Sequence, residues 1–367
     1  MEKYIVLPFS KPIINHIPTD ASRLSILAAQ NQVLPIVHNF MNIFAFSIKT
    51  NEDNYILDTQ FYWNINEIER KLIPKVIITD IVPLLWNSLQ NNYYINICTD
   101  RCKLSSYKSH DINKVFPHQM CIYGMDLEKK ICYCADFFSE KGYEETCVKI
   151  EDLQIANDSL QNEVCNLDPL TGATDWVSDI ELLKPLLHYN QSLNLELIYK
   201  SIQNFLEGRN IFGYTSYTRK RPHVMTYRVP QNGRWLYEAD VVSECYGIDV
   251  FYEIKHFLSE SSDCSGYLIN KKMFYIIYAY QKLMLYRLQY LSQNVEGINL
   301  ANIIKQYEKL LADSQVILYN GIKLEITNQE KIKVKVITLI DTHIKNTKQI
   351  LSEFWGIIYQ SIDEKRM

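Results

Sequence analysis

The chain has 367 residues, 47% of them hydrophobic and 22% charged, a balance typical of a soluble globular protein that is long enough for two domains. The formal net charge of −4, with no basic tail and no zinc-finger spacing, argues against binding to nucleic acid. The sequence shows no signal-peptide pattern and no uninterrupted apolar stretch of membrane-spanning length, so we expect a cytoplasmic protein. Its nine cysteines are scattered along the chain, which indicates reduced thiols rather than a disulfide framework.

Alternating apolar residues and turn signals predict a strand-rich first domain over residues 1–160. Pro18-Thr19-Asp20 is a helix-start signal, with Thr19 or Asp20 expected as the N-cap. Strands are predicted at 4–8, 44–49, 55–57, 93–98 and 146–150, and helices at 78–89 and from 151. Residues 99–114 are a polar, charged stretch, and a loop is predicted at 137–144.

Residues 118–136 are predicted to form a β-hairpin with a chemically capable residue at each end. Side chains alternate between the two faces of a strand, and the arms pair across a turn near 126–129, so His118 and Asp136 are expected to lie close together. A histidine oriented by an aspartate is the base half of a nucleophilic triad. The plainer interpretation is a surface histidine at one strand end and an aspartate at the other.

The second half of the chain is predicted to be helical. A linker is expected over residues 161–179, followed by a mostly helical domain over 180–367. Helices are predicted over 193–207, 248–258, 267–292 and 299–318, with a possible strand pair around 224–229 and 235–242. Thr327 and Glu330 have the spacing of a capping box for a last helix that reaches about residue 360.

The run from Phe116 to Ala156 combines a histidine, an apolar strand, a Tyr-Gly-x-Asp turn, a strand that ends in aspartate, and a short strand before an acidic helix start. These positions are His118, Tyr123-Gly124-Met125-Asp126, Asp136, Tyr143 and Glu151-Asp152-Leu153. The pattern resembles a bacterial family that shares the N-terminal domain of the butirosin-biosynthesis acyltransferase, a papain-like fold related to bacteriocin-processing cysteine peptidases. The resemblance implies an α+β fold, in which a papain-like domain with a mostly antiparallel sheet precedes a helical C-terminal domain.

The family resemblance also implies a chemistry. Its members carry a cysteine nucleophile on an N-terminal central helix, a histidine on a strand, and an aspartate or asparagine after it. A thiolate at a helix N-terminus can accept an acyl or aminoacyl group from a carrier-protein thioester and pass it to an amine. The implied partners are an acyl or peptidyl carrier protein, with the substrate tethered to its phosphopantetheine, and a small-molecule amine acceptor. No other cofactor is implied.

This chain departs from the family pattern at the nucleophile. No cysteine precedes Cys98, so the first predicted helix carries no thiol. Ser22 or Thr19 could serve as a hydroxyl nucleophile against His118, although both are also ordinary residues at a helix start. Cys98 and Cys102 could approach His118 in space, but neither precedes a predicted helix.

Two further clusters have alternative interpretations. Arg219, Lys220 and Arg221 could contact an acidic carrier protein or a phosphopantetheine phosphate, or could belong to a solvated loop. Cys132 and Cys134 form a C-x-C that a zinc site could use only with a second matched pair, so we interpret them as buried thiols and predict no metal site.

The leading prediction is therefore acyl transfer in natural-product biosynthesis of the nonribosomal-peptide type. His118 would be the general base, Asp136 would orient it, and Ser22 would be the nucleophile. The alternatives are a catalytically inactive accessory, immunity or binding protein of such a pathway, and a peptidase.

Overall fold

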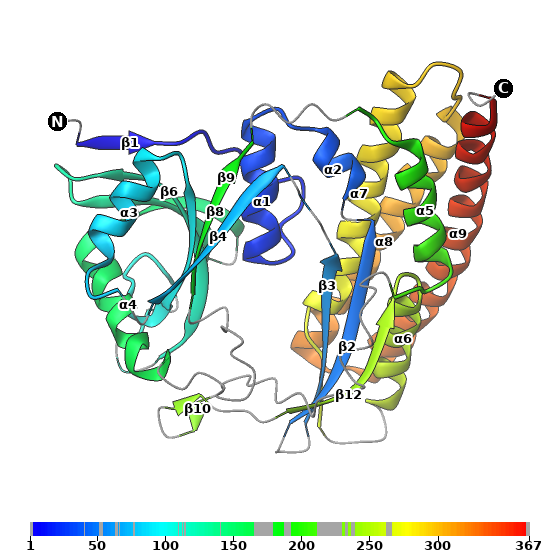
Figure 1. The fold of residues 1–367 in the computed structure, drawn as a ribbon. Helices are drawn as coiled ribbons and strands as arrows, with labels where there is room; N and C mark the ends of the chain where they lie inside the picture. Colours follow the sequence, from blue (N-terminus) through cyan, green and yellow to red (C-terminus); the bar gives the residue numbers. More distant parts are fainter. Residues whose placement is uncertain are drawn as a thin grey trace. The chain divides into compact units, whose positions relative to one another are not determined.

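A computed structural model gives the fold as two compact units. It describes residues 3–39, 41–50, 54–62, 65, 67–75, 78–108, 110–111, 113, 115–139, 141–164, 179–186, 192–210, 230–231, 234–235, 239–261 and 266–364. The protein mixes helices and strands, with a mostly antiparallel main sheet and helices in its C-terminal part (Figure 1), so the expected α+β class is confirmed. None of the helices in the described ranges contains an apolar stretch of membrane-spanning length.

The first unit, residues 1–33, 65–190 and 230–234, is built on a seven-stranded sheet. The strands run in the order β4-β9-β5-β6-β7-β8, with β1 paired to β6, and all these pairings are antiparallel. The strands are β1 (Tyr4–Val6), β4 (Ile68–Pro74), β5 (Tyr94–Asp100), β6 (Pro117–Asp126), β7 (Ile131–Ser139), β8 (Gly142–Lys149) and β9 (Asp179–Pro185).

Helices cover both faces of this sheet. They are α1 (Pro18–Ala29), α3 (Ile81–Gln90), the short 3₁₀ helix η2 (Arg101–Lys103) and α4 (Ile150–Val164). Figure 1 shows α1 on one side of the sheet and α3 and α4 on the other. The central strand β5 is buried along its whole length, as expected for a strand with both faces covered.

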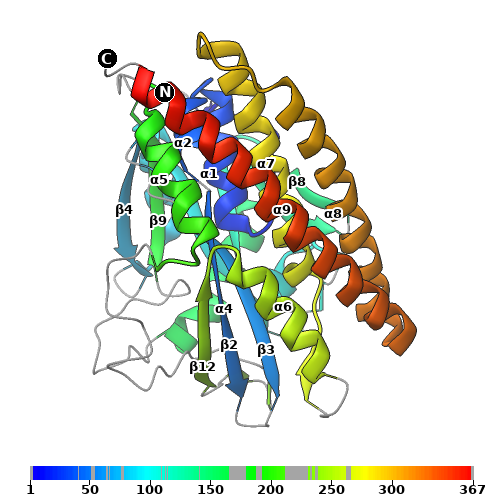
Figure 2. The same cartoon turned by 90° about the vertical axis from the view of Figure 1, so that its right-hand side faces the viewer.

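The second unit, residues 34–64, 191–229 and 235–367, packs helices around a four-stranded sheet in the order β12-β2-β3-β13. The strands are β2 (Asn42–Thr50), β3 (Tyr55–Tyr62), β12 (Ala239–Tyr246) and β13 (Tyr267–Leu268). The helices are α2 (Leu34–His38), α5 (Leu195–Leu206), α6 (Asp249–Glu260), α7 (Lys272–Asn294), α8 (Ala301–Thr327) and α9 (Glu330–Glu364). Figure 2 shows α8 at the edge of this helical layer. Two further short strands, β10 (Pro230–Gln231) and β11 (Arg234–Trp235), pair with each other.

The units are not continuous in sequence, unlike the expected division into 1–160, a 161–179 linker and 180–367. Residues 34–64 group with the second unit because β2 pairs with β12, about two hundred positions further along the chain. Strand β9 groups with the first unit because it pairs with both β4 and β5.

Several predicted boundaries were wrong for local reasons. Ile17, and neither Thr19 nor Asp20, is the N-cap of α1, because Pro18 occupies the first helical position, where its fixed φ is already helical. Thr327 begins no capping box, because it is the last residue of α8 and its hydroxyl donates to the Lys323 carbonyl. The expected loop at 137–144 is occupied instead by the end of β7 and the start of β8.

A buried arginine fixes α2 in the second unit. The Arg287 guanidinium donates from Nε to the Val37 carbonyl at 2.6 Å and from Nη2 to the Asn39 carbonyl at 2.7 Å. These carbonyls lie at the C-terminal end of α2, where a positive charge is favourable. Burial lowers the pKa of Arg287 to about 10, so the guanidinium remains charged at neutral pH.

A second buried polar group links α7 to α9. Gln281 Nε2 lies 3.0 Å from His343 Nε2 and 3.2 Å from Thr347 Oγ1, to which it donates. All three side chains are buried. Burial lowers the pKa of His343 to about 3, so its imidazole is neutral in the folded protein at ordinary pH.

His343 is therefore expected to make stability depend on pH. Between about pH 6.5 and the folded pKa of about 3, the unfolded chain binds a proton that the folded chain does not, so stability falls with decreasing pH. Relative to neutral pH, the free energy of unfolding is expected to be about 2 kcal/mol lower at pH 5, as measured by urea unfolding. The variant His343→Gln should not show this decrease. The largely exposed His256 provides the control, because His256→Gln should keep the wild-type dependence. A variant His343→Gln that loses as much stability as the wild type would contradict this assignment.

Candidate functional site

The structure brings His118 and Asp136 together at the open end of the β6–β7 hairpin. Ile122 on β6 faces Cys134 on β7, and His118 and Asp136 lie on the same face as this pair, because each is an even number of positions away. His118 Nε2 lies 3.1 Å from Asp136 Oδ2. The atoms are close enough for an ion pair but are not aligned for a hydrogen bond.

Asp136 is fully buried and has a second partner. The Tyr107 hydroxyl donates a hydrogen bond to Asp136 Oδ2. Burial, followed by the neighbouring Asp136 carboxylate, raises the pKa of Tyr107 well above its ordinary value, so the phenol stays neutral and remains a donor. Tyr107 lies in the segment 99–114, which sequence reasoning treated only as a polar stretch.

The imidazole of His118 is partly open to solvent, with its side chain 20% exposed. The rings of Tyr107 and Phe116 lie beside it, with centroids 6.0 and 6.3 Å from the imidazole. Because Nε2 faces the carboxylate, Nδ1 is the ring atom directed away from it. The pair could therefore orient a general base, which is one half of a nucleophilic mechanism.

The structure does not bring Ser22 to this histidine. The Ser22 hydroxyl is fully buried, donates to the Thr19 carbonyl at 3.0 Å, and accepts from Asn96 Nδ2 at 3.1 Å. On β5 and β6, Asn96 pairs with Cys121 and Thr99 pairs with His118, in an uninterrupted register. Positions three residues apart on a strand point to opposite faces, so Ser22 contacts the face of the sheet opposite to His118.

The start of α1 offers no other nucleophile next to His118 among the described residues. Its N-cap is the apolar Ile17, and Thr19 belongs to the same helix, which contacts the sheet through Ser22 and Asn96 on the face opposite to His118. Cys98 and Cys102 are buried, and burial raises the pKa of Cys102, which keeps it a thiol.

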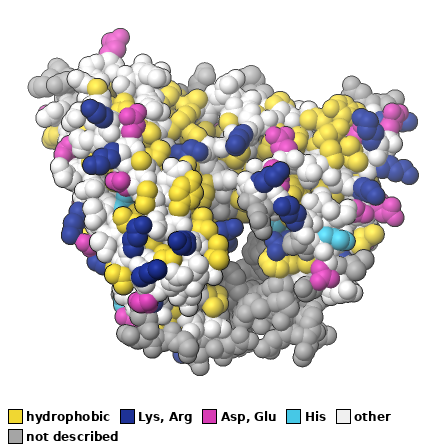
Figure 3. Space-filling view, turned by 180° about the vertical axis from the view of Figure 1, so that it is seen from behind, with side chains coloured by type: hydrophobic (Ala, Val, Ile, Leu, Met, Phe, Trp, Pro, Cys, Tyr) yellow, Lys and Arg dark blue, Asp and Glu magenta, His cyan; other side chains and the backbone are white. Residues whose placement is uncertain are grey.

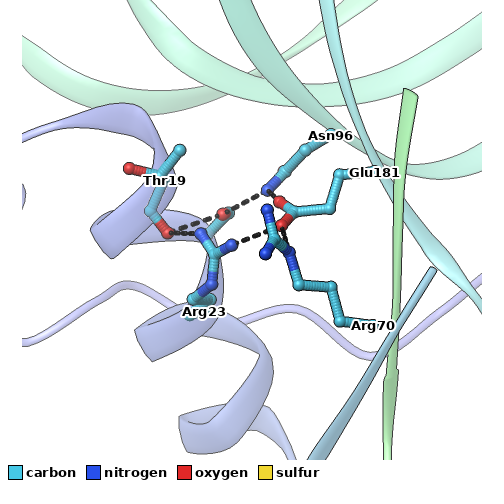
Figure 4. Close-up of polar contacts among 6 residues, drawn as sticks. Thr19, Arg23, Arg70, Asn96 and Glu181 are labelled. Carbon is cyan, nitrogen blue, oxygen red and sulfur yellow. Dashed lines mark hydrogen bonds and ion pairs between the residues drawn. The ribbon is translucent and has the colours of Figure 1, made fainter. Parts of the chain in front are cut away.

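Ser22 belongs to a buried polar network that fixes α1 to the sheet. Figure 4 shows Arg23, Asn96, Arg70 and Glu181 of this network. Glu181 on β9 accepts from Arg23 Nη2 at 2.6 Å, from Asn96 Nδ2 at 2.9 Å, and from Arg70 Nε. Burial alone would raise the pKa of Glu181, but Arg23 and Arg70 outweigh it and lower the pKa overall. Sequence reasoning missed this network; its signal was a charged residue on an otherwise buried stretch of each element, Arg23 in α1 and Glu181 in β9.

The other predicted clusters give no functional geometry. The seven cysteines in the described part of the chain are free, and burial raises the pKa of Cys132 to about 12. No group of His, Cys, Asp or Glu side chains within the described ranges could hold a metal ion. Arg219, Lys220 and Arg221 lie outside the described residues. Figure 3 shows lysine and arginine side chains scattered among hydrophobic and acidic ones on the face it draws.

Comparison with known proteins adds no family. No protein-family model matches the sequence, and no curated protein matches it.

The Glu181 network predicts that loss of the buried carboxylate costs far more stability than loss of its exposed arginine partner. Glu181→Ala is expected to lower the free energy of unfolding by about 3–5 kcal/mol, because it leaves Arg23 charged and buried without its carboxylate. Arg70→Ala, the matched control, should cost about 0–1 kcal/mol, because the Arg70 side chain is 53% exposed. Urea unfolding measures both, and equal losses would show that the buried pair is not the dominant contact.

Proposed function

We propose that this chain is a catalytically silent, papain-like relative of the butirosin-type acyltransferases, and that it acts by binding a carrier protein or a peptide-like product. The observation that carries the proposal is the position of Ser22. Its hydroxyl is buried, donates a hydrogen bond to the Thr19 carbonyl and accepts one from Asn96. The sheet separates it from His118. The fold assignment is supported by the residue pattern over 116–156 and by the antiparallel hairpin on which that pattern lies.

A silent protein should not form an acyl-enzyme. Incubation of the full chain with an acyl N-acetylcysteamine thioester is expected to give no covalent mass increase and no thioester hydrolysis above the buffer rate. The exposed Cys147 could react chemically, so Cys147→Ser provides the background variant. An adduct that persists in Cys147→Ser and disappears in Cys147→Ser/His118→Ala would refute silence.

Acyl transfer is the second candidate, and one observation favours it. His118 Nε2 lies 3.1 Å from the buried Asp136 carboxylate, which places the imidazole beside the kind of group that orients a general base. In this case the nucleophile would come from outside the α1 hydroxyls, and the same thioester experiment would show a His118-dependent adduct or turnover.

The binding function also predicts a role for Arg219, Lys220 and Arg221. If these residues receive the phosphate of a carrier protein's prosthetic arm, calorimetry should detect binding of free 4′-phosphopantetheine that weakens with added salt. The triple variant Arg219→Ala/Lys220→Ala/Arg221→Ala should bind at least about tenfold more weakly, since each lost charge-assisted hydrogen bond is worth about 1.5–3 kcal/mol. Unchanged binding in the triple variant would place the phosphate elsewhere.

A further inference from the structure

Helix α8 exposes an apolar stripe on its outer face. Its buried residues pack toward α7 and α9, leaving the opposite side open to solvent among the described residues. On that side Val316 is 44% exposed, Tyr319 60% and Ile326 77%. Apolar side chains this exposed, and close together on one helix face, are typical of an interaction surface.

The spacing of these residues is that of a helix-pairing seam. Val316, Tyr319, Lys323 and Ile326 follow one another at intervals of three, four and three residues, and therefore form one stripe along the helix. Upstream, the neighbours of Val316 at helical spacing are Ala312 and the charged Asp313; downstream, the stripe stops where α8 ends at Thr327.

The stripe is also complementary to itself. Suppose that two copies of α8 pair antiparallel about a two-fold axis near position 321. A residue that lies a given number of positions before 321 then faces the residue that lies the same number of positions after 321 in the second copy. Val316 then faces Ile326 of the second copy, and Tyr319 faces Lys323 of the second copy. Each apolar residue meets an apolar residue, and each ammonium group meets an aromatic ring, to which it is attracted. No like charges face each other within the stripe.

We infer that α8 is the interface of a homodimer, formed by antiparallel pairing of the stripe Val316–Ile326 with its copy. Such an interface is isologous, since the same patch serves on both sides. A pattern that is symmetric about one position favours a second copy over an unrelated partner, whose stripe would have no reason to mirror this one.

Charge reversal at the facing pair tests the register. Sedimentation of the full chain over a range of concentrations should show a monomer–dimer equilibrium. Tyr319→Lys should raise the dissociation constant at least about tenfold, because it sets two lysines against each other at two symmetric places. Tyr319→Lys/Lys323→Glu should restore dimerisation, because unlike charges then face each other. The matched control is Tyr359→Lys, at a tyrosine that is 52% exposed on α9, and it should have no effect.

Cysteine pairs provide a second measurement that does not depend on affinity. In a Cys147→Ser background, the double variant Val316→Cys/Ile326→Cys should oxidise to a covalent dimer, because the two positions face each other across the axis. Val316→Cys/Tyr319→Cys places no two thiols opposite each other and should stay largely uncrosslinked. A wild-type chain that is monomeric at every concentration would overturn the proposal. It would also fail if the charge-reversal double variant were as weak as Tyr319→Lys, or if both cysteine pairs crosslinked equally.

Discussion

The buried carboxylate of Glu181 is the contact on which the first unit depends. It joins Arg23 of α1 to the sheet through β9, and it also holds the Asn96 amide of β5. Separating Arg23 from Glu181 would leave two unpaired charges buried, which is energetically costly. The ion pair therefore fixes the rotation of α1 about its own axis relative to the sheet. That setting turns Ser22 toward Asn96 and therefore away from the face that carries His118. The geometry of the candidate site thus follows from an ion pair outside it.

The second unit fixes its elements with buried polar groups of a different kind. Arg287 meets backbone carbonyls at the end of α2, and His343 is a neutral imidazole beside an amide. Carbonyl and amide partners need no counter-charge, but they accept few alternative geometries. An apolar core tolerates sliding between helices better than such contacts do, so these groups define how α2 and α9 lie against α7.

The parts of the fold that sequence reasoning predicted are those determined by nearby residues. The β6–β7 hairpin follows from alternation and a turn within a few positions, and it brings His118 to Asp136 as expected. Strand β4 was missed because Glu69, Arg70 and Lys71 interrupt its apolar pattern, as charges often do on an edge strand. The relation between Ser22 and His118 could not be predicted. It depends on which face α1 covers, and that is set by pairing between β5, β6 and β9 across large sequence separations.

The His118–Asp136 pair does not by itself require catalysis. A carboxylate buried as completely as that of Asp136 needs polar partners whatever the protein does. Tyr107 donates a hydrogen bond to it, and His118 Nε2 lies 3.1 Å from it. Loss of either partner would leave the buried charge of Asp136 less stabilised. The His118–Asp136 pair therefore contributes to stability even in a protein that has no nucleophile. The same geometry that would orient a base therefore also stabilises the hairpin. For this reason the position of the hydroxyl, rather than the presence of the histidine, separates the binding function from acyl transfer.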